Sequence, residues 1–427
     1  MRGAFVLLIL FALSGLPSPA SEARAASLDI YALSAADQPY ARYLSTHAVV
    51  PEQRAECAKV QRFWVNSLSL RKRLAFPVAV GETLYRVDLR DYGWTAAAWD
   101  KLAEKDVYFR EPWVDANSAE VLAYYSKAAY PILRSDFFVA RTSVEPDYSR
   151  FLGLGKSIDE IRKQFGVQSD DAKRLYLNSG GAVLQSIVAI HNRQLERTPT
   201  ITGYFWESRD VRGNDGKRNV ISGGDNLFAI KQDGGEFIWS LPNGLQAYYL
   251  ADGNGKQVNE VPPDIARDTV TAFAQKTVVN ARSCVVCHAG GINPFNDVIS
   301  KLIRGDKLKL VDPDKERVIR LEEFYLSATA KRIERDNEQF TDAVEACNGL
   351  KGPANAKAFE TLVYGYFDGR ITAEVACREL GIEKPEAVLG RSLNGTLTAM
   401  LAGESVARDA WEEAYHEAAI LSFGVKK

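Results

Sequence analysis

The spacing of apolar residues changes along the chain and divides it into three regions after the N-terminus. Over 27–200 and 262–427, apolar residues recur every three or four positions, which is typical of helices. Over 201–261, short apolar runs stand between clusters of Gly, Asn and Asp, which is typical of strands joined by turns. The pattern predicts an α+β protein that is mainly helical. It has a mainly helical N-terminal region, a small antiparallel β region and an all-α C-terminal domain.

In the N-terminal region, helices are expected over 28–62, 118–134 and 157–165. The first range should hold two helices, the second opened by Pro51, because proline suits the first helical turn. Ser157 followed by Glu160 forms a capping box at the start of the last helix. Apolar and polar residues alternate over 83–89, which predicts a strand that could join the small sheet.

Strands of the β region are expected over 203–206, 220–221, 227–230, 236–240 and 246–250. Asp233-Gly234 and Asn254-Gly255 are typical of hairpin turns between such strands. In the C-terminal domain, helices are expected over 294–303, 314–347, 356–367, 373–380, 385–393, 396–401 and from Ser405 to Phe423.

The first 26 residues show a pattern of their own. Arg2 precedes an apolar run over 4–16, and Pro17 and small residues around Ala25 follow. A basic start, an apolar run of about 13 residues and a small-x-small ending predict a Sec-type signal peptide, cleaved after Ala25 or Ala26. No later stretch is apolar enough to span a membrane. The mature protein is therefore expected to be periplasmic or secreted, in a bacterium.

The charge balance excludes some classes of partner. The chain has 53 basic and 55 acidic residues, a net charge of −2. A protein that binds nucleic acid or an anionic membrane through its overall charge would need a basic excess. We therefore expect no nucleic-acid partner.

The segment Cys284-Val285-Val286-Cys287-His288 carries the clearest chemical signal. The pattern Cys-x-x-Cys-His is typical of covalent c-type haem attachment. Two thiols at this spacing can each add to one vinyl group of haem, and the following histidine can bind the iron through a ring nitrogen. The motif predicts one covalently attached haem c, with Cys284, Cys287 and His288 as its binding residues.

Two other interpretations of this cysteine pair are disfavoured. A thioredoxin-like dithiol follows a strand in a βαβ unit, and the pattern around Cys284 indicates none. A zinc site needs a second ligand pair, and the chain has no other CxxC or HxxxH. Cys57, Cys347 and Cys377 remain. In an oxidising compartment Cys347 and Cys377 could pair, and pairing of Cys57 with either is the alternative.

With this motif among expected helices, the C-terminal domain resembles a monohaem c-type cytochrome. Residues 42–45, 86–94 and 240–246 are also similar to large secreted bacterial proteins of unassigned role that carry one CxxCH each. The first resemblance implies a periplasmic cytochrome that transfers single electrons to an unidentified redox partner. The second implies that the N-terminal part and the haem part form one unit.

The sixth ligand of the iron remains open. Small electron-transfer cytochromes place a methionine some tens of residues after the motif, whereas here the candidate is Met400, far downstream. The histidine alternatives are His416, His191 and, least favoured, His47. An open iron is the remaining alternative, and it would suit a haem enzyme or a sensor of peroxide or gas.

Residues 290–294 offer a way to orient His288. Gly290 and Gly291 let the backbone approach the porphyrin. The carbonyl of Pro294, or a nearby backbone oxygen, could accept the second ring N–H of His288. A plain turn into the next helix is the alternative.

Overall fold

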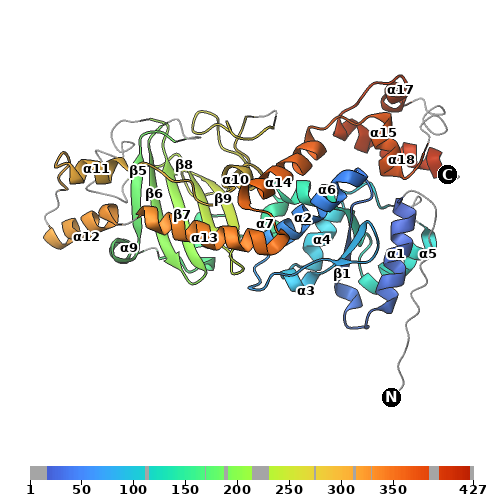
Figure 1. The fold of residues 1–427 in the computed structure, drawn as a ribbon, viewed down its shortest axis with the longest axis horizontal. Helices are drawn as coiled ribbons and strands as arrows, with labels where there is room; N and C mark the ends of the chain where they lie inside the picture. The colour runs from blue at the N-terminus through green and yellow to red at the C-terminus, as the bar shows by residue number, and fades with distance from the viewer. Residues whose placement is uncertain are drawn as a thin grey trace, which may run out of the picture.

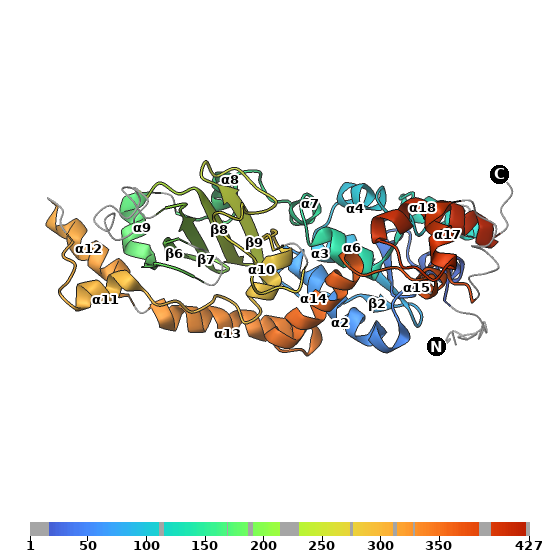
Figure 2. The same cartoon turned by 90° about the horizontal axis from the view of Figure 1, so that it is seen from above.

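The computed structural model describes residues 17–110, 115–168, 170–186, 191–213, 230–273, 276–310, 314–327, 329–383 and 394–423. It confirms the mixed α+β class, with a four-stranded mixed sheet and a five-stranded antiparallel sheet in these ranges. The molecule is elongated, with one sheet in each half and α13 lying along one side (Figures 1 and 2).

The N-terminal half is built around the four-stranded sheet, whose order is β2-β3-β1-β4. Only β1 and β4 pair in parallel. The strands are β1 (Ala41–Ser45), β2 (Val78–Ala79), β3 (Leu84–Asp88) and β4 (Ile132–Arg134). The helices here are α1 (Pro19–Ala32), the 3₁₀ helix η1 (Gln38–Tyr40), α2 (Pro51–Ser67), α3 (Leu89–Tyr92), α4 (Ala96–Ala103), α5 (Ala116–Ser126), α6 (Ser135–Thr142) and α7 (Asp147–Leu152).

Three expectations for this half need correction. The range 28–62 is not continuously helical, because β1 lies between α1 and α2; Pro51 does open α2, as predicted. The helix expected over 118–134 ends at Ser126, where Lys127 adopts a left-handed conformation, and the chain continues into β4. The strand expected over 83–89 exists as β3. It pairs with β1 and β2, not with the small sheet.

The five-stranded sheet follows the order of the sequence. Its strands are β5 (Ser179–Val183), β6 (Arg193–Thr200), β7 (Gly203–Asp210), β8 (Gly234–Ser240) and β9 (Gln246–Asp252). The sheet begins before residue 201, where the β region was expected to start. The strand expected at 220–221 and most of the one at 227–230 lie outside the described residues. Helices α8 (Ile158–Gln164) and α9 (Asp171–Leu177) precede the sheet, and Ser157 caps α8 as predicted.

The C-terminal part is helical. Its helices are α10 (Arg282–Cys287), α11 (Val298–Arg304), α12 (Lys315–Leu326), α13 (Thr329–Asn348), α14 (Gly352–Phe367), α15 (Ala373–Leu380), α17 (Gly395–Leu401) and α18 (Arg408–Phe423). The expected helix over 385–393 lies outside the described residues. These helices are distributed over both halves of the molecule, from α11 and α12 at one end to α17 and α18 at the other (Figure 1).

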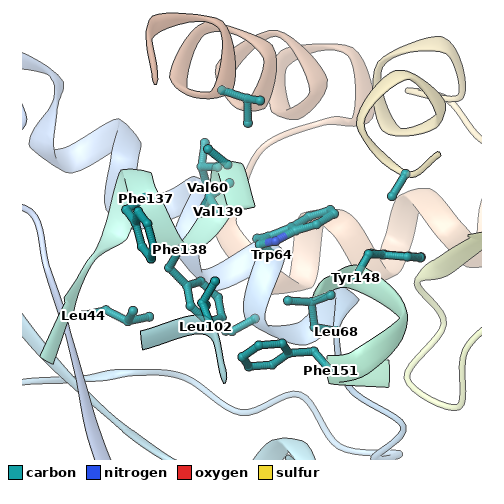
Figure 3. Packing of buried hydrophobic residues seen from close by; sticks show 14 of the residues in the cluster. Leu44, Val60, Trp64, Leu68, Leu102, Phe137, Phe138, Val139, Tyr148 and Phe151 are labelled. Carbon is teal, nitrogen blue, oxygen red and sulfur yellow. The ribbon is translucent and has the colours of Figure 1, made fainter. Parts of the chain in front are cut away.

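A shared core joins the two ends of the sequence. Trp64 of α2 is fully buried, and its ring lies 4.9 Å from that of Phe359 in α14 and 6.1 Å from that of Tyr148 in α7. Figure 3 shows this packing around Trp64. The Trp64 indole N–H donates to Thr142 Oγ1 at 2.7 Å, which satisfies its only polar atom. Helices that precede the five-stranded sheet in the sequence thus pack into one core with a helix that follows it.

Helix α1 crosses the expected cleavage position after Ala25 or Ala26. Ala23 and Ala26 are fully buried. Cleavage would leave only the second part of the helix. That part carries Asp29, which pairs with Arg86 at 2.6 Å and accepts from the Tyr43 hydroxyl at 2.9 Å. None of the helices in the described ranges has the length and apolar character needed to cross a bilayer.

Candidate functional site

Helix α10 carries the Cys-x-x-Cys-His motif and is held by a buried aspartate. Asp268 is fully buried, and its carboxylate accepts from the Ser283 hydroxyl at 2.7 Å and the Thr271 hydroxyl at 2.7 Å. The Ser283 oxygen in turn accepts from the Val279 N–H at 3.1 Å. These bonds tie the first turn of α10 to the preceding loop, so the motif has a fixed place.

The three motif residues face one cavity of about 820 Å³. Cys284 is 1% exposed and His288 is 9% exposed, while Cys287 is partly buried. The cavity lies between one face of the five-stranded sheet and the segment 258–298. Its volume lies within the usual range for cofactor sites, roughly 300–1,000 Å³. Apolar side chains supply much of its wall, among them Leu195, Trp206, Ile238, Leu250, Ile265, Val270, Val278, Ile292 and Phe295.

A backbone carbonyl orients His288. Its Nδ1 lies 3.0 Å from the Gly291 oxygen. Because a carbonyl oxygen only accepts, Nδ1 must carry the proton in this contact. The partner is thus a nearby backbone oxygen, as expected, although it is Gly291 and not Pro294. Nε2 is left directed into the cavity, which is the arrangement that a histidine ligand of a metal requires.

The turn that supplies this carbonyl is itself clamped by α13. Asn337 Oδ1 accepts from the Ile292 N–H at 2.6 Å, and its Nδ2 donates to the Ile292 oxygen at 2.9 Å. Gly291 adopts φ +99°, and a Cβ at this position would lie 2.3 Å from Asn337 Oδ1. Only glycine therefore fits between the histidine and the clamp.

A carboxylate pairs with the second ring nitrogen of His288, Nε2. Glu236 Oε1 of β8 lies 3.3 Å from Nε2, and Glu236 Oε2 lies 3.5 Å from Arg193 Nη1. Burial raises the pKa of the Glu236 carboxyl, but His288 and Arg193 outweigh that effect and hold it at about 2. Glu236 is therefore an anion at neutral pH. Arg193 is paired further with Asp210.

Both motif cysteines are free thiols. Burial raises the pKa of Cys284 well above its usual value and that of Cys287 to about 12, and nearby carboxylates add to both shifts. The thiols are therefore neutral in the cavity. Cys57, Cys347 and Cys377 form no disulfide either. The disulfide considered between Cys347 and Cys377 is not formed, because each is buried in its own helix without a bond to the other.

The structure brings Cys284, Cys287 and His288 together but does not bring Met400 to them. Met400 is 1% exposed in α17, and both views place α17 far from α10 (Figures 1 and 2). His47 is fully buried beside Glu379, with its Nε2 3.2 Å from that residue's carbonyl oxygen. His416 is exposed on α18. Among the described residues, His288 is the only histidine that lines the cavity, and no methionine does.

Sequence reasoning missed Glu236, Arg193 and Asn337. One signal for Glu236 was present. Gly234, Glu236 and Ile238 share a face of β8, so a charged residue stands at an inward position of a mostly apolar strand. A charge at such a position usually has a functional or paired role.

The residues present fit a covalently bound haem. The cavity is mostly apolar and has a suitable volume, and two neutral thiols and an imidazole face it. One ring nitrogen of the imidazole is already hydrogen-bonded to the backbone, and the other is directed into the cavity. Imidazole and thiol chemistry at this spacing suits haem c. Comparison with known proteins gives no match: no family model, no curated protein and no solved structure is significantly similar to this chain.

Proposed function

We propose that this protein is a periplasmic or secreted monohaem c-type cytochrome that binds one haem covalently and transfers single electrons. Cys284 and Cys287 would form the thioether bonds, and His288 would be the proximal ligand of the iron. The single observation that carries the proposal is the convergence of these three side chains on one cavity of about 820 Å³. The cofactor would supply a metal that cycles between two oxidation states.

The chain's own residues have defined tasks in this proposal. Gly291 holds the Nδ1 proton of His288, so that Nε2 keeps its lone pair for the metal. The apolar wall, which includes Trp206 and Ile238, excludes water and lowers the local dielectric, one of the factors that set a haem potential. The described residues of the segment 258–298 line the cavity opposite the sheet face.

The experiment is expression of the full chain in a bacterium that matures c-type haem. The purified protein should be red, keep its pigment through acid-acetone extraction, and gain the mass of one haem. Cys284→Ala and Cys287→Ala should each lose one thioether bond, and the double variant should lose covalent haem. Cys347→Ala is the matched control, because Cys347 is also a buried free thiol but lies in α13, outside the cavity. A colourless wild-type protein with free motif thiols would contradict the proposal.

A second candidate function is a haem enzyme, or a sensor of peroxide or gas, with an accessible iron. It is favoured by one observation: within the described ranges, neither Met400 nor His47, His191 or His416 lines the cavity. The reduced spectrum separates the two functions. Sharp bands that carbon monoxide leaves unchanged support electron transfer alone, whereas a shift with carbon monoxide supports ligand binding.

A further inference from the structure

Glu236 lines the same cavity as the motif residues and faces His288, the proposed ligand of the iron. It projects from the middle of β8 into the cavity, and its Oε1 lies 3.3 Å from His288 Nε2. We infer that Glu236 binds the haem iron from the side opposite His288, and that Arg193 and Asp210 hold it in that position. This inference rests on the proposed function, because it needs haem at Cys284, Cys287 and His288.

The observed separation is close to what two opposite ligands require. Bonds from a first-row metal to imidazole nitrogen and to carboxylate oxygen are each about 2.0–2.2 Å, so a metal between them holds the two atoms about 4 Å apart. The separation of 3.3 Å is that of a direct ion pair. The two side chains would therefore have to move apart by about 0.8 Å to admit a metal between them.

The other polar groups of Glu236, its Oε2 and its backbone N–H, already have partners. Oε1 is therefore the oxygen that faces the cavity. Oε2 faces Arg193 Nη1 at 3.5 Å. The Glu236 N–H donates to Ser208 Oγ at 2.9 Å, and that hydroxyl donates to Asp210 Oδ2 at 3.0 Å. Arg193 Nη2 donates to the same carboxylate oxygen at 3.1 Å. One carboxylate oxygen is thus held by the sheet and the other is presented to His288, as a preorganised ligand requires.

Burial and charge support the same assignment. The Glu236 side chain is only 13% exposed, and an ionised carboxylate in such a place needs compensating positive charge. Arg193 is shared with Asp210, and the remaining partner of Glu236 is His288. A ferric iron between Glu236 and His288 would add positive charge at that position. An anionic ligand stabilises the ferric form, so Glu236 would keep the reduction potential low.

The test compares Glu236→Gln with the wild-type haem protein. The amide keeps the shape of the side chain but is a much weaker metal ligand. In the variant the ferric spectrum should change to that of an iron with water or no ligand opposite His288. Cyanide should bind with a roughly tenfold higher apparent affinity or more, because apparent affinity is limited by the fraction of molecules whose site is free. Glu260→Gln is the matched control, since Glu260 is an exposed carboxylate that lines the same cavity from the segment 258–298, and it should behave like the wild type.

A second measurement uses the wild-type protein alone, so a variant that fails to fold does not decide the matter. Resonance Raman spectra of the ferric protein in normal and oxygen-18 water should be identical if Glu236 is the ligand. An isotope shift of an iron–oxygen band would overturn the inference, because it identifies bound water. So would an E236Q protein with covalent haem and an unchanged spectrum. Absence of covalent haem from the wild type would instead overturn the proposed function.

Discussion

Asn337 binds both polar groups of the Ile292 backbone, accepting from its N–H at 2.6 Å and donating to its carbonyl at 2.9 Å. The preceding residue, Gly291, supplies the carbonyl that holds His288. Helix α13 runs alongside the five-stranded sheet and extends towards α2 (Figure 2). It also packs against α2. The orientation of the proposed iron ligand therefore depends on a side chain of the long helix that connects both halves.

Replacement of Asn337 by alanine should loosen this turn. Two hydrogen bonds are lost and two backbone groups become unsatisfied, which should lower the free energy of unfolding by about 1–3 kcal/mol. In the haem-loaded protein the bands that report on the His288–iron bond should broaden or shift. Urea unfolding and the optical spectrum check both effects. Asn293→Ala is the control, because Asn293 is exposed and makes one longer bond, 3.2 Å, to the Cys287 oxygen. Equal effects of the two variants would contradict the role of Asn337.

Gly291 and Gly290 provide a matched pair for the same turn. Gly291→Ala places a Cβ in a left-handed conformation and 2.3 Å from Asn337 Oδ1, so it should destabilise the protein by about 1–3 kcal/mol. At Gly290 a Cβ meets nothing within 4 Å, so Gly290→Ala should cost less than about 0.5 kcal/mol. Thermal unfolding of both haem-loaded variants measures the difference. Equal melting temperatures would show that the turn is not constrained as described.

Local signals in the sequence were sufficient to predict several elements. Pro51 marks the start of α2, and Ser157 marks the start of α8. Strand β1 was missed for a physical reason: all five of its residues are buried, so the alternation that reveals a strand with one exposed face is absent. That β3 could join the small sheet was considered, and it pairs with β1 and β2 instead. Strand pairing is a non-local property that the pattern of one strand does not carry.

The same distinction applies to the site. Cys284, Cys287 and His288 were found because their chemistry lies in consecutive positions. Glu236 and Asn337 reach His288 from β8 and α13, and only the fold brings them there. Met400 was weighed on its residue type and its place in the sequence. Its location in space depends on the fold, in which α17 packs beside α18.

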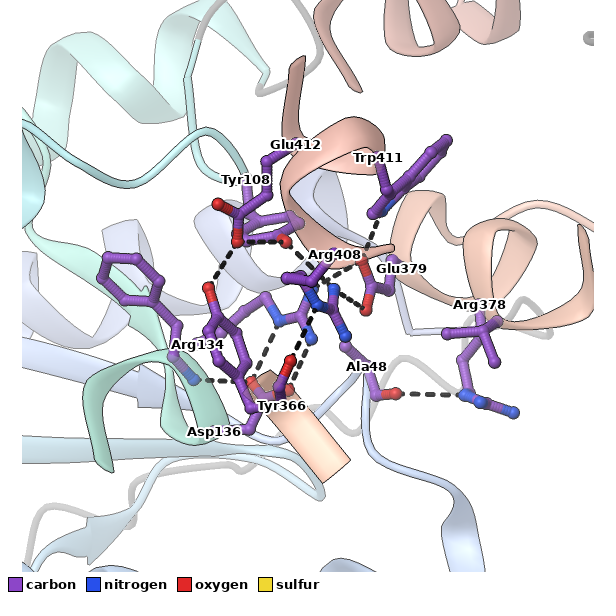
Figure 4. Close-up of polar contacts among 12 residues, drawn as sticks. Ala48, Tyr108, Arg134, Asp136, Tyr366, Arg378, Glu379, Arg408, Trp411 and Glu412 are labelled. Carbon is purple, nitrogen blue, oxygen red and sulfur yellow. Dashed lines mark hydrogen bonds and ion pairs between the residues drawn. The ribbon is translucent and has the colours of Figure 1, made fainter. Parts of the chain in front are cut away.

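A buried ionic cluster joins the first sheet to the last helices and gives a prediction on stability. Glu379 of α15 is paired with Arg134 of β4 at 2.7 Å and with Arg408 of α18 at 2.6 Å (Figure 4). It also accepts from the Trp411 indole at 2.7 Å. Burial alone would raise the pKa of Glu379, but the two guanidinium groups hold it at about 2. This carboxylate is therefore charged over the whole physiological range.

Glu379→Gln should lower the free energy of unfolding by about 3 kcal/mol or more, because it leaves buried guanidinium charge uncompensated. Glu374→Gln is the control in the same helix, since Glu374 is exposed and should change stability by less than about 1 kcal/mol. The folded-state pKa of Glu379 is depressed from 4.5. Its stabilisation is therefore present above pH 4.5 and is lost as the pH falls towards 2. Urea unfolding at pH 7 tests the first effect, and an E379Q protein as stable as the wild type would contradict it.

Asp106 should give the protein a pH dependence of the opposite sign. Its side chain is buried. Oδ1 accepts from the Tyr108 N–H at 2.6 Å, and Oδ2 has no hydrogen-bond partner within the described part of the chain. Burial raises the pKa of Asp106 from 3.8 to about 7, although Tyr108, Arg134 and Arg110 oppose the shift. Between these two values the folded state binds more protons than the unfolded state, so stability falls as the pH rises through this window.

The contribution of Asp106 is measured as the change in unfolding free energy between pH 5 and pH 8, compared with Asp106→Asn. A shift of about three pKa units corresponds to roughly 4 kcal/mol at most, and we expect about 2–3 kcal/mol within this window. D106N cannot ionise and should lose that part of the pH dependence. Glu104→Gln, an exposed acid near Asp106 in the chain, should keep the wild-type dependence. If D106N and the wild type lose stability equally between pH 5 and pH 8, Asp106 is not the buried carboxyl that titrates there, since an amide has no proton to release over that range.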